Sequence, residues 1–249
     1  MMANEKVALI TGAARGLGKD IAEVLGRDGF RLYLLDILDE RLAETAEEFG
    51  GKGFTVFTRK TDVSLHDDAF AAVADCIAAF GRLDVLVNCA GIVRFNHADQ
   101  VPQAEWDRIL GVNLSGPFFM TQAALPHLIA VAGNIVNIAS SNGLRGTPYT
   151  LPYAATKAAL ISMTKTLAVE YVDAPIRVNA VCPGPMNTEI GADLVFQPTM
   201  QPEKMARYAG QRPAAEAMEV AEVVGFLASA AASAVHGAIW TADGGITAG

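Results

Sequence analysis

Short aliphatic runs alternate with longer amphipathic segments along the whole chain. Most of the short runs are apolar throughout, which is typical of strands buried on both faces of a parallel sheet. These runs predict strands at Val7–Ile10, Arg31–Asp36, Phe54–Thr58, Leu83–Asn88, Asn134–Ile138, Ile176–Val181 and Ala238–Thr241. The amphipathic segments predict helices at about Leu17–Arg27, Glu40–Phe49, Asp67–Phe80, Gln103–Ile109, Pro117–Ala130, Tyr153–Val172 and Val220–Ser229.

This alternation predicts an α/β fold, a Rossmann-type doubly wound sheet of about seven parallel strands with helices on both faces. No repeat, linker or low-complexity tract interrupts the pattern, so we expect residues 1–249 to form one domain. Residues 188–211 break the rhythm, because Pro198 and Pro202 stand there among apolar side chains. An apolar insertion of this kind is typical of a lid over a binding site, although a plain packing excursion is the alternative.

Charge and polarity narrow the classes of partner. The net charge is −8 and Lys and Arg form no cluster, which argues against nucleic-acid binding. Residues 109–144 and 223–242 carry no charged side chain, but polar and helix-breaking residues interrupt both stretches. We therefore expect buried elements there and no membrane span.

Cysteine and histidine spacing indicates neither disulfides nor a metal. Cys76, Cys89 and Cys182 are far apart in sequence, which fits a reducing compartment, and the chain start lacks the apolar stretch of a signal peptide. We therefore expect a cytoplasmic protein. The histidines show no metal-binding spacing, so no metal site is predicted, although His97 could border a substrate.

The first predicted strand runs into a glycine-rich turn, Gly12-x-x-x-Gly16-x-Gly18, and a helix follows. Glycines let the backbone turn tightly and approach a pyrophosphate, whose charge then lies at the helix N-terminus. This spacing differs from the more familiar Gly-x-Gly-x-x-Gly, and a glycine-rich turn alone is a weak signal. Its position between the first strand and the first helix favours a dinucleotide site.

Asp36 ends the second predicted strand, 18 residues after Gly18. An acid at this position can accept hydrogen bonds from the adenosine ribose hydroxyls and would repel a 2′-phosphate, so the sequence favours NAD over NADP. A solvated strand end or a cap for the next helix is the alternative interpretation. Arg15 could meet a 2′-phosphate and keeps NADP open.

Tyr153 and Lys157 are four residues apart at the start of a predicted helix and therefore share a face. A free phenol has a pKa of about 10, and a nearby ammonium lowers it toward the range of a useful acid or base. Ser140 follows a buried strand, 13 residues before Tyr153. Ligands of doubly wound sheets bind at the carboxyl ends of strands, so Ser140 could donate to a substrate oxygen there.

Taken in order, these motifs resemble those of the single-domain short-chain dehydrogenase/reductase family over essentially the whole chain. Asn88-Cys89-Ala90-Gly91 is similar to the family's Asn-Asn-Ala-Gly, with a cysteine in place of the second asparagine. The resemblance implies catalytic residues at Asn113, Ser140, Tyr153 and Lys157. It places cofactor-binding residues at Gly12, Arg15, Gly16, Leu17, Gly18, Asp36, Ile37, Asp62, Val63, Asn88, Ala90, Gly91, Tyr153, Lys157, Pro183, Gly184, Met186 and Thr188. Asp243-Gly244-Gly245 matches the usual C-terminal signature.

The same resemblance implies the role of each residue. Tyr153 would exchange a proton with the substrate oxygen, which Ser140 orients. Lys157 would bind the nicotinamide ribose and lower the pKa of the tyrosine. Asn113 would hold a water that connects Lys157 to solvent. The substrate would be a secondary alcohol or ketone that exchanges a hydride with NAD(H), and a sugar, polyol, hydroxy acid, steroid or ketone all stay open. The residues that follow the site motifs suggest a mixed but largely apolar pocket, bordered by Ile92, Val93, Phe95, Asn142, Leu144, Met186 and residues 188–211.

Two other functions stay open: a 3-oxoacyl-carrier-protein reductase, and a non-enzymatic dinucleotide sensor on the same fold. The acidic net charge weakens the first, because carrier proteins are acidic and favour a basic docking face. The sensor is disfavoured because all four catalytic residues of the family, the tetrad Asn113, Ser140, Tyr153 and Lys157, are present. The family is mostly dimeric or tetrameric, and the uncharged 109–144 stretch favours a homotetramer or homodimer through helices near 117–130 and 153–172.

Overall fold

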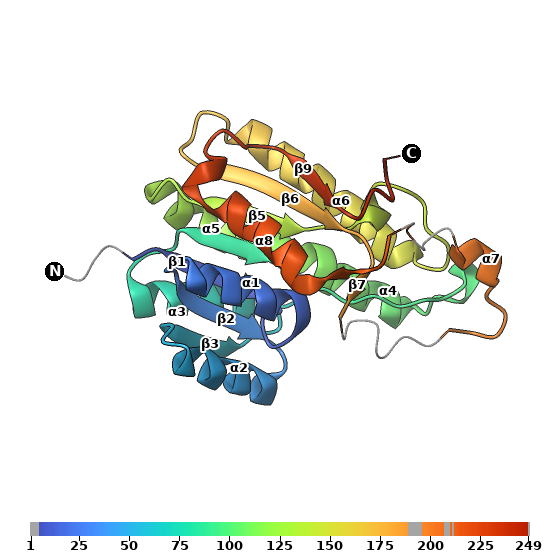
Figure 1. The fold of residues 1–249 in the computed structure, drawn as a ribbon, viewed down its shortest axis with the longest axis horizontal. Coiled ribbons are helices and arrows are strands. Elements are labelled where there is room, and N and C mark those ends of the chain that lie inside the picture. Colours follow the sequence, from blue (N-terminus) through green and yellow to red (C-terminus); the bar gives the residue numbers. More distant parts are fainter. Residues whose placement is uncertain (1–4, 189–195, 207–209, 211, 249) are drawn as a thin grey trace.

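The computed structural model describes residues 5–188, 196–206, 210 and 212–248. Its main sheet is parallel throughout, with the strand order β3-β2-β1-β4-β5-β6-β9 (Figure 1). The strands are β1 (Val7–Thr11), β2 (Arg31–Asp36), β3 (Val56–Lys60), β4 (Val85–Asn88), β5 (Asn134–Ile138), β6 (Arg177–Pro183) and β9 (Ile239–Ala242). The chain leaves β1 in one direction and returns to pair β4 on its other side, so the order reverses between these two strands. Ligands of such sheets bind at this reversal.

Helices cover both faces of the sheet, which confirms the predicted Rossmann-type class. One layer contains α1 (Gly16–Arg27), α2 (Asp39–Gly51) and α8 (Ala217–Ala228), which contribute to one buried apolar cluster. The other contains α3 (His66–Phe80), α5 (Gly116–Ala130) and α6 (Leu151–Glu170). Between α3 and α5 lie the 3-10 turn η1 (Ala98–Gln100), α4 (Gln103–Leu110) and the π-helical turn η2 (Gly111–Ser115).

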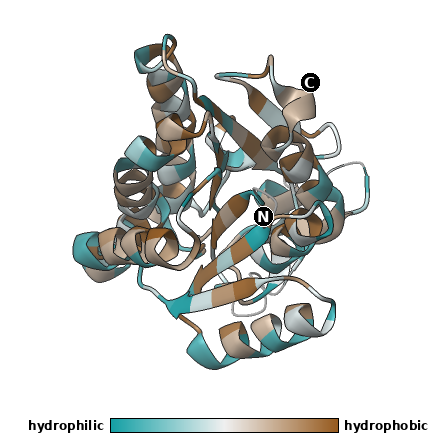
Figure 2. Cartoon of the chain, turned by 90° about the vertical axis from the view of Figure 1, so that its left-hand side faces the viewer, coloured by the Kyte–Doolittle hydropathy of each residue, from teal (hydrophilic) through white to brown (hydrophobic). Residues whose placement is uncertain are grey.

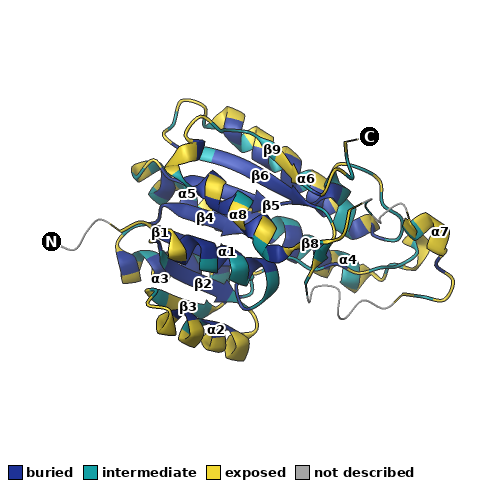
Figure 3. Cartoon of the chain, in the orientation of Figure 1, coloured by how far each residue is buried: buried dark blue, intermediate teal, exposed yellow. Residues whose placement is uncertain are grey.

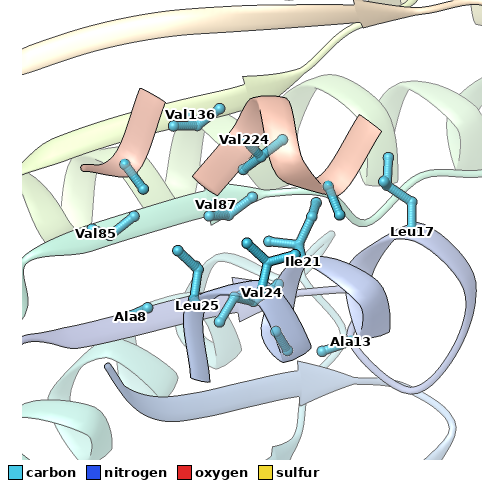
Figure 4. Packing of buried hydrophobic residues seen from close by; sticks show 14 of the residues in the cluster. Ala8, Ala13, Leu17, Ile21, Val24, Leu25, Val85, Val87, Val136 and Val224 are labelled. Atoms are coloured by element: carbon cyan, nitrogen blue, oxygen red, sulfur yellow. The ribbon is translucent and has the colours of Figure 1, made fainter. Parts of the chain in front are cut away.

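Alternation along the central strands divides the core between the two layers. Ala8 and Ile10 of β1 enter the cluster beneath α1 and α8, while Val7 and Leu9 enter the cluster on the opposite face. Both faces are therefore apolar, as the sequence pattern predicts for buried parallel strands. Figure 4 shows the first cluster, in which side chains of α1 and α8 meet valines of β4 and β5. In Figure 3 the central strands are buried and the exposed residues lie on the outer helix surfaces.

Small residues and a capping box set the position of α8. A side-chain carbon at Gly225 would lie 2.6 Å from a methyl of Val24 in α1, so glycine permits the close approach of these helices. At the start of α8, the Glu216 side chain accepts from the backbone of Glu219, and the Glu219 side chain accepts from the Glu216 amide. This reciprocal capping satisfies amides that have no partner within the helix.

The third strand departs from its predicted bounds. It was expected at Phe54–Thr58, but it spans Val56–Lys60 and lies at the sheet edge. Phe54 packs against Phe49 at 5.7 Å between ring centres, whereas Phe57 on the strand is half exposed. In Figure 2 the hydrophobic colouring dominates the inner strands, and hydrophilic colour extends to the outer parts of the fold. An edge strand has fewer neighbours, so a fully apolar pattern is not required of it.

Several short elements were not predicted. They are the 3-10 turns η3 (Ser141–Gly143) and η6 (Ala230–Ala232), the helix α7 (Pro202–Met205) and the paired strands β7 (Met186–Asn187) and β8 (Ala215–Glu216). The helix α7 lies within the expected lid at 188–211, of which residues 189–195, 207–209 and 211 are outside the described residues. In the part of the chain that is described, no helix is both long and apolar enough to cross a membrane.

Candidate active site

A cleft of about 290 Å³ opens at the carboxyl ends of the strands, beside the β1/β4 reversal. It brings together nearly all of the residues expected to bind a cofactor or to act in catalysis. Those that line it are Gly12, Arg15, Gly16, Leu17, Gly18, Asp36, Ile37, Asp62, Val63, Ala90, Gly91, Ser140, Tyr153, Lys157, Pro183, Gly184, Met186 and Thr188. Asn88 and Asn113 were expected there and do not line it.

The glycine-rich turn is held tightly against the end of β4. Gly12 has a φ of +70°, and a side-chain carbon there would lie 2.8 Å from the Ala90 Cα. A side-chain carbon at Gly18 would collide with the Gly12 carbonyl. The Thr11 hydroxyl accepts hydrogen bonds from the amides of Cys89 and Ala90, both at 3.0 Å. The turn therefore brings backbone to the floor of the cleft, and α1 begins there with its amides unpaired within the helix.

Two backbone amides orient the Asp36 carboxylate. One carboxylate oxygen accepts from the Ala14 amide at 3.0 Å and the other accepts from the Leu38 amide at 3.0 Å. The carboxylate is thus fixed at the end of β2 while it still lines the cleft. Each oxygen retains a free lone pair, which can accept a hydroxyl from a ligand.

Arg108 of α4 also lines the cleft, and the sequence analysis did not predict it as a site residue. Its guanidinium donates to the Asp62 carboxylate at 2.9 Å and to the Ser64 hydroxyl at 3.0 Å. Burial raises the pKa of Asp62, but the hydrogen bonds from Ser64 and Arg108 outweigh it and hold this pKa below its usual range. Asp62 is therefore a fixed anion. No local motif links positions 62 and 108, since only the packing of α4 brings them together.

Ser140 and Tyr153 both line the cleft, and the Ser140 hydroxyl lowers the pKa of the Tyr153 phenol. Burial raises this pKa by more, so the pKa lies above its ordinary value. This corrects the expectation of a lowered pKa for the protein alone. The reason is that withdrawal from water destabilises the charged phenolate more strongly than its neighbours stabilise it.

Lys157 lies beside this tyrosine, with its Nζ 5.6 Å from the centre of the Tyr153 ring. Its ammonium donates to the carbonyl of Ile138 at 2.7 Å, and the residue is only 4% exposed. Burial lowers the pKa of Lys157 to about 8. The lysine is thus an anchored cation that loses its proton far more readily than a surface lysine does.

Asn113 does not line the cleft but binds the backbone of Ile92, which does. It lies in the π-helical turn η2 and is fully buried. Its side chain accepts from the Ile92 amide at 2.8 Å, donates to the Ile92 carbonyl at 2.8 Å and donates to the Thr156 hydroxyl at 3.3 Å. A side-chain carbon at Gly91 would lie 3.5 Å from both Asn113 Oδ1 and Lys157 Nζ, so these two groups are neighbours. π-Helical turns are frequent at functional sites.

The side chain of Asn88 points into the core and not into the cleft. Its amide nitrogen donates to Asn137 Oδ1 at 2.9 Å and to the Thr121 hydroxyl at 3.3 Å. Asn137 continues the chain by donating to Thr164 of α6 at 2.9 Å. The predicted cofactor-binding role of Asn88 stays a prediction, and the amide of its side chain is engaged with Asn137 and Thr121. This side chain connects β4 to β5 and to the helices behind them.

The residues after β6 form the opposite wall. A side-chain carbon at Gly184 would lie 2.8 Å from the Asp243 Cα, so glycine allows the two segments to touch. Asp243 accepts from the amides of Gly245 and Thr247 at 2.9 and 3.0 Å, which fixes the C-terminal signature. The Thr188 hydroxyl is buried and has no hydrogen-bond partner among the described residues. A buried polar atom facing a cleft indicates a ligand that would satisfy it.

This arrangement fits a nicotinamide dinucleotide. The glycine-rich turn can hold the pyrophosphate, the Asp36 carboxylate can accept from a ribose, and the buried Thr188 hydroxyl has no partner among the described residues. The hydroxyls of Ser140 and Tyr153 and the Lys157 ammonium line the same cleft. The fold and the site define the class of Rossmann-type oxidoreductases. A sequence-family model described as short chain dehydrogenase matches residues 6–198. The chain belongs to the short-chain dehydrogenase family, as the resemblance in the sequence predicted, and is an oxidoreductase of that family.

Relatives that match this chain over nearly their whole length have different names. The chain is 39% identical to "Oxidoreductase UcpA" of Salmonella typhimurium, over 97% of this chain and 94% of that protein. It is 38% identical to 2-(R)-hydroxypropyl-CoM dehydrogenase of Xanthobacter autotrophicus, over 98% and 99% of the two chains. A crystal structure of 3-ketoacyl-(acyl-carrier-protein) reductase from Brucella melitensis complexed with NADH has a TM-score of 0.88 and 32% identity, covering 97% of this chain and 98% of that one.

Proposed function

We propose that this protein transfers a hydride between NAD(H) and a secondary alcohol or ketone. The observation that carries the proposal is that Ser140, Tyr153 and Lys157 line one cleft, with the Lys157 ammonium 5.6 Å from the centre of the Tyr153 ring. The NADH complex of the Brucella melitensis reductase supports the choice of cofactor. The bound nicotinamide supplies or accepts the hydride.

The residues of this chain supply the proton and the positioning. Ser140 donates to the substrate oxygen and holds it against the Tyr153 hydroxyl, which gives or takes the proton. Lys157 binds the ribose hydroxyls of the cofactor and stabilises the phenolate. The raised pKa of Tyr153 in the protein alone suits a proton donor, and this pKa would be lowered for oxidation by the positive charge of a bound oxidised nicotinamide. Asn113 holds the backbone of Ile92, and so the wall of the cleft, in place.

The experiment is a comparison of Tyr153→Phe with the wild-type enzyme and with Tyr171→Phe, whose ring does not line the cleft. A panel of secondary alcohols is tested with NAD, following the absorbance of NADH, and NADH binding is measured by fluorescence. We expect Tyr153→Phe to lose turnover and to bind NADH nearly as well as the wild type, while Tyr171→Phe keeps both properties. Substantial turnover by Tyr153→Phe would refute its assigned role.

Asp36 supports NAD over NADP, because its carboxylate is fixed toward the cleft by two backbone amides. A 2′-phosphate near this anion would be repelled. We expect the catalytic efficiency with NAD to exceed that with NADP and the preference to diminish in Asp36→Ala. Arg15 and Arg108 both line the cleft and could meet a phosphate, so a wild-type preference for NADP would point to them.

Reduction of a 3-oxoacyl group on a carrier protein is the second candidate, favoured by the likeness to the Brucella melitensis reductase. The net charge of −8 opposes it, because acidic carrier proteins favour a basic docking face. Oxidation of NADH or NADPH by 3-oxoacyl carrier protein, compared with the free ketone, separates the two. A preserved tetrad opposes a purely sensory role.

We also propose that the protein is a homotetramer or homodimer of the cytoplasm. Large apolar side chains are exposed along α5 and α6 and just beyond α6: Phe118 is 49%, Val169 75% and Val172 65% exposed. Exposed apolar faces of this kind are typical of subunit contacts. Three cysteines, none of them in a disulfide, support a reducing compartment. A monomeric mass by light scattering at micromolar concentration would contradict the oligomer.

A further inference from the structure

Tyr149 has a backbone conformation that a tyrosine rarely adopts. Its φ is +67°, and among the described residues only Ala132 shares a positive φ without being glycine. A side chain in this left-handed region is strained, and such strain persists where the surrounding contacts outweigh it. Tyr149 precedes the catalytic Tyr153 by four residues and lies directly before α6. The strain therefore lies next to the helix that carries the proton donor.

The contacts that hold Tyr149 come from two segments far apart in sequence. Its carbonyl accepts from the Asn96 amide at 2.9 Å, in the loop after β4. Its hydroxyl accepts from the Gln201 amide at 3.0 Å, at the start of α7. The His97 ring meets the Tyr149 ring edge-on, with 5.1 Å between centres. Tyr149 therefore contacts both segments: its backbone carbonyl binds the loop after β4, and its hydroxyl binds the start of α7.

These two segments are also bonded directly to each other. Gln197 donates to the Asn96 side chain at 2.7 Å, and a ring nitrogen of His97 lies 3.0 Å from the Thr199 hydroxyl. We call the group that joins them the clasp. It consists of Asn96, His97, Tyr149, Gln197, Thr199 and Gln201. Beside it, the rings of Phe95 and Phe196 pack at 5.0 Å between centres.

The clasp connects the start of α6 to the loop after β4, because Tyr149 lies two residues before α6 and Asn96 lies in that loop. Ile92 begins this loop, lines the cleft and is clamped by Asn113. At the other end of the clasp, the Thr150 carbonyl accepts the Ala154 amide in the first turn of α6. The segment with α7 extends beyond the carboxyl ends of the strands (Figure 1). The clasp residues do not themselves line the cleft, so they act on it through the loop that Ile92 begins and through the start of α6.

We propose that Tyr149 is a positioning residue that fixes these two segments together and thereby limits the size of substrate that reaches the catalytic tyrosine. This inference rests on the proposed function and names the part of the chain that sets its specificity. The strained backbone holds the Tyr149 carbonyl toward Asn96 while its phenol reaches Gln201. Only tyrosine makes the second contact, because glycine would permit the backbone and keep the carbonyl contact but would lack the phenol.

Two variants separate this role from ordinary packing. Tyr149→Phe removes only the acceptor of the Gln201 amide, and Tyr149→Gly removes the ring while it relieves the backbone strain. Tyr171→Phe is the matched control, because its ring does not line the cleft or join the clasp. Each protein is assayed with secondary alcohols of increasing chain length, and amide hydrogen exchange is followed at Gln201. The NADH dissociation constant and the melting temperature are measured in parallel.

We expect Tyr149→Gly to raise kcat/KM for long alcohols relative to short ones, by about fourfold for each additional methylene that the opened site buries. NADH binding should not fall. In Tyr149→Phe the Gln201 amide should exchange roughly two- to twelvefold faster, as the loss of one hydrogen bond implies. An unchanged ratio across the alcohol series, or an equal loss for all alcohols, would overturn the proposal.

Failure of the proposed function gives a different result. A wild-type enzyme that turns over no alcohol or ketone with either cofactor refutes that function, and it does so without the Tyr149 variants. Exchange at Gln201 then decides whether the clasp holds its segment. Unchanged exchange in Tyr149→Phe overturns the clasp, and faster exchange in both Tyr149 variants but not in Tyr171→Phe supports its positioning role.

Discussion

Burial of the charged Lys157 side chain lowers the free energy of unfolding, and this effect should be visible in the pH dependence of stability. The residue is 4% exposed, and burial lowers its pKa from 10.5 to about 8. One pKa unit corresponds to about 1.4 kcal/mol, so the protonated lysine destabilises the fold by about 3 kcal/mol at neutral pH.

The sign follows from where each state releases its proton. The unfolded chain keeps the lysine proton up to its ordinary pKa of 10.5, whereas the folded protein gives it up near 8. Between these values the unfolded state binds more protons, so the free energy of unfolding rises with pH. Integrated between pH 8 and pH 9, the contribution of Lys157 is a gain of about 1 kcal/mol, equivalent to about 2–4 °C in Tm for a domain of this size.

The assay is calorimetric unfolding of the cofactor-free protein at pH 7, 8 and 9, for the wild type and Lys157→Met. Other titrating groups are shared by both proteins, so the difference between their stabilities isolates Lys157. The wild type should gain about 1 kcal/mol relative to the variant from pH 8 to pH 9. Lys165→Met is the control, because Lys165 is exposed on the same helix and its variant should show no such change. A gap between wild type and Lys157→Met that is independent of pH would refute the reasoning.

Three further variants test the frame of the cleft. Gly18→Ala should lower Tm by several degrees and weaken NADH binding, because the added carbon collides with the glycine turn; Gly50→Ala has open space and should not lower Tm. Thr11→Val leaves two amides of the β4 turn without their acceptor and should cost about 1–3 kcal/mol by denaturant unfolding, with weaker NADH binding. Asn113→Ala releases the Ile92 backbone, and we expect kcat to fall more than NADH affinity; equal losses in both would contradict a positioning role.

The sequence by itself determined the fold class and most of the candidate site. Apolar runs without alternation can be satisfied only by strands covered on both faces, and this fixed the parallel sheet and its helices. The glycine turn, Asp36 and the Tyr153–Lys157 pair were readable because each depends on local spacing along one strand end or one helix. Local spacing survives folding unchanged, so these residues reached one cleft as predicted.

Only the tertiary structure decided what depends on packing between distant segments. Position 88 ends a strand, and nothing local indicates that its side chain turns into the core toward Asn137. Arg108 enters the cleft because α4 lies across its end, 46 residues after the Asp62 that it binds. The raised pKa of Tyr153 follows from the extent of its burial, which sequence spacing does not specify. The contacts of Tyr149 join three segments whose proximity exists only in the folded chain.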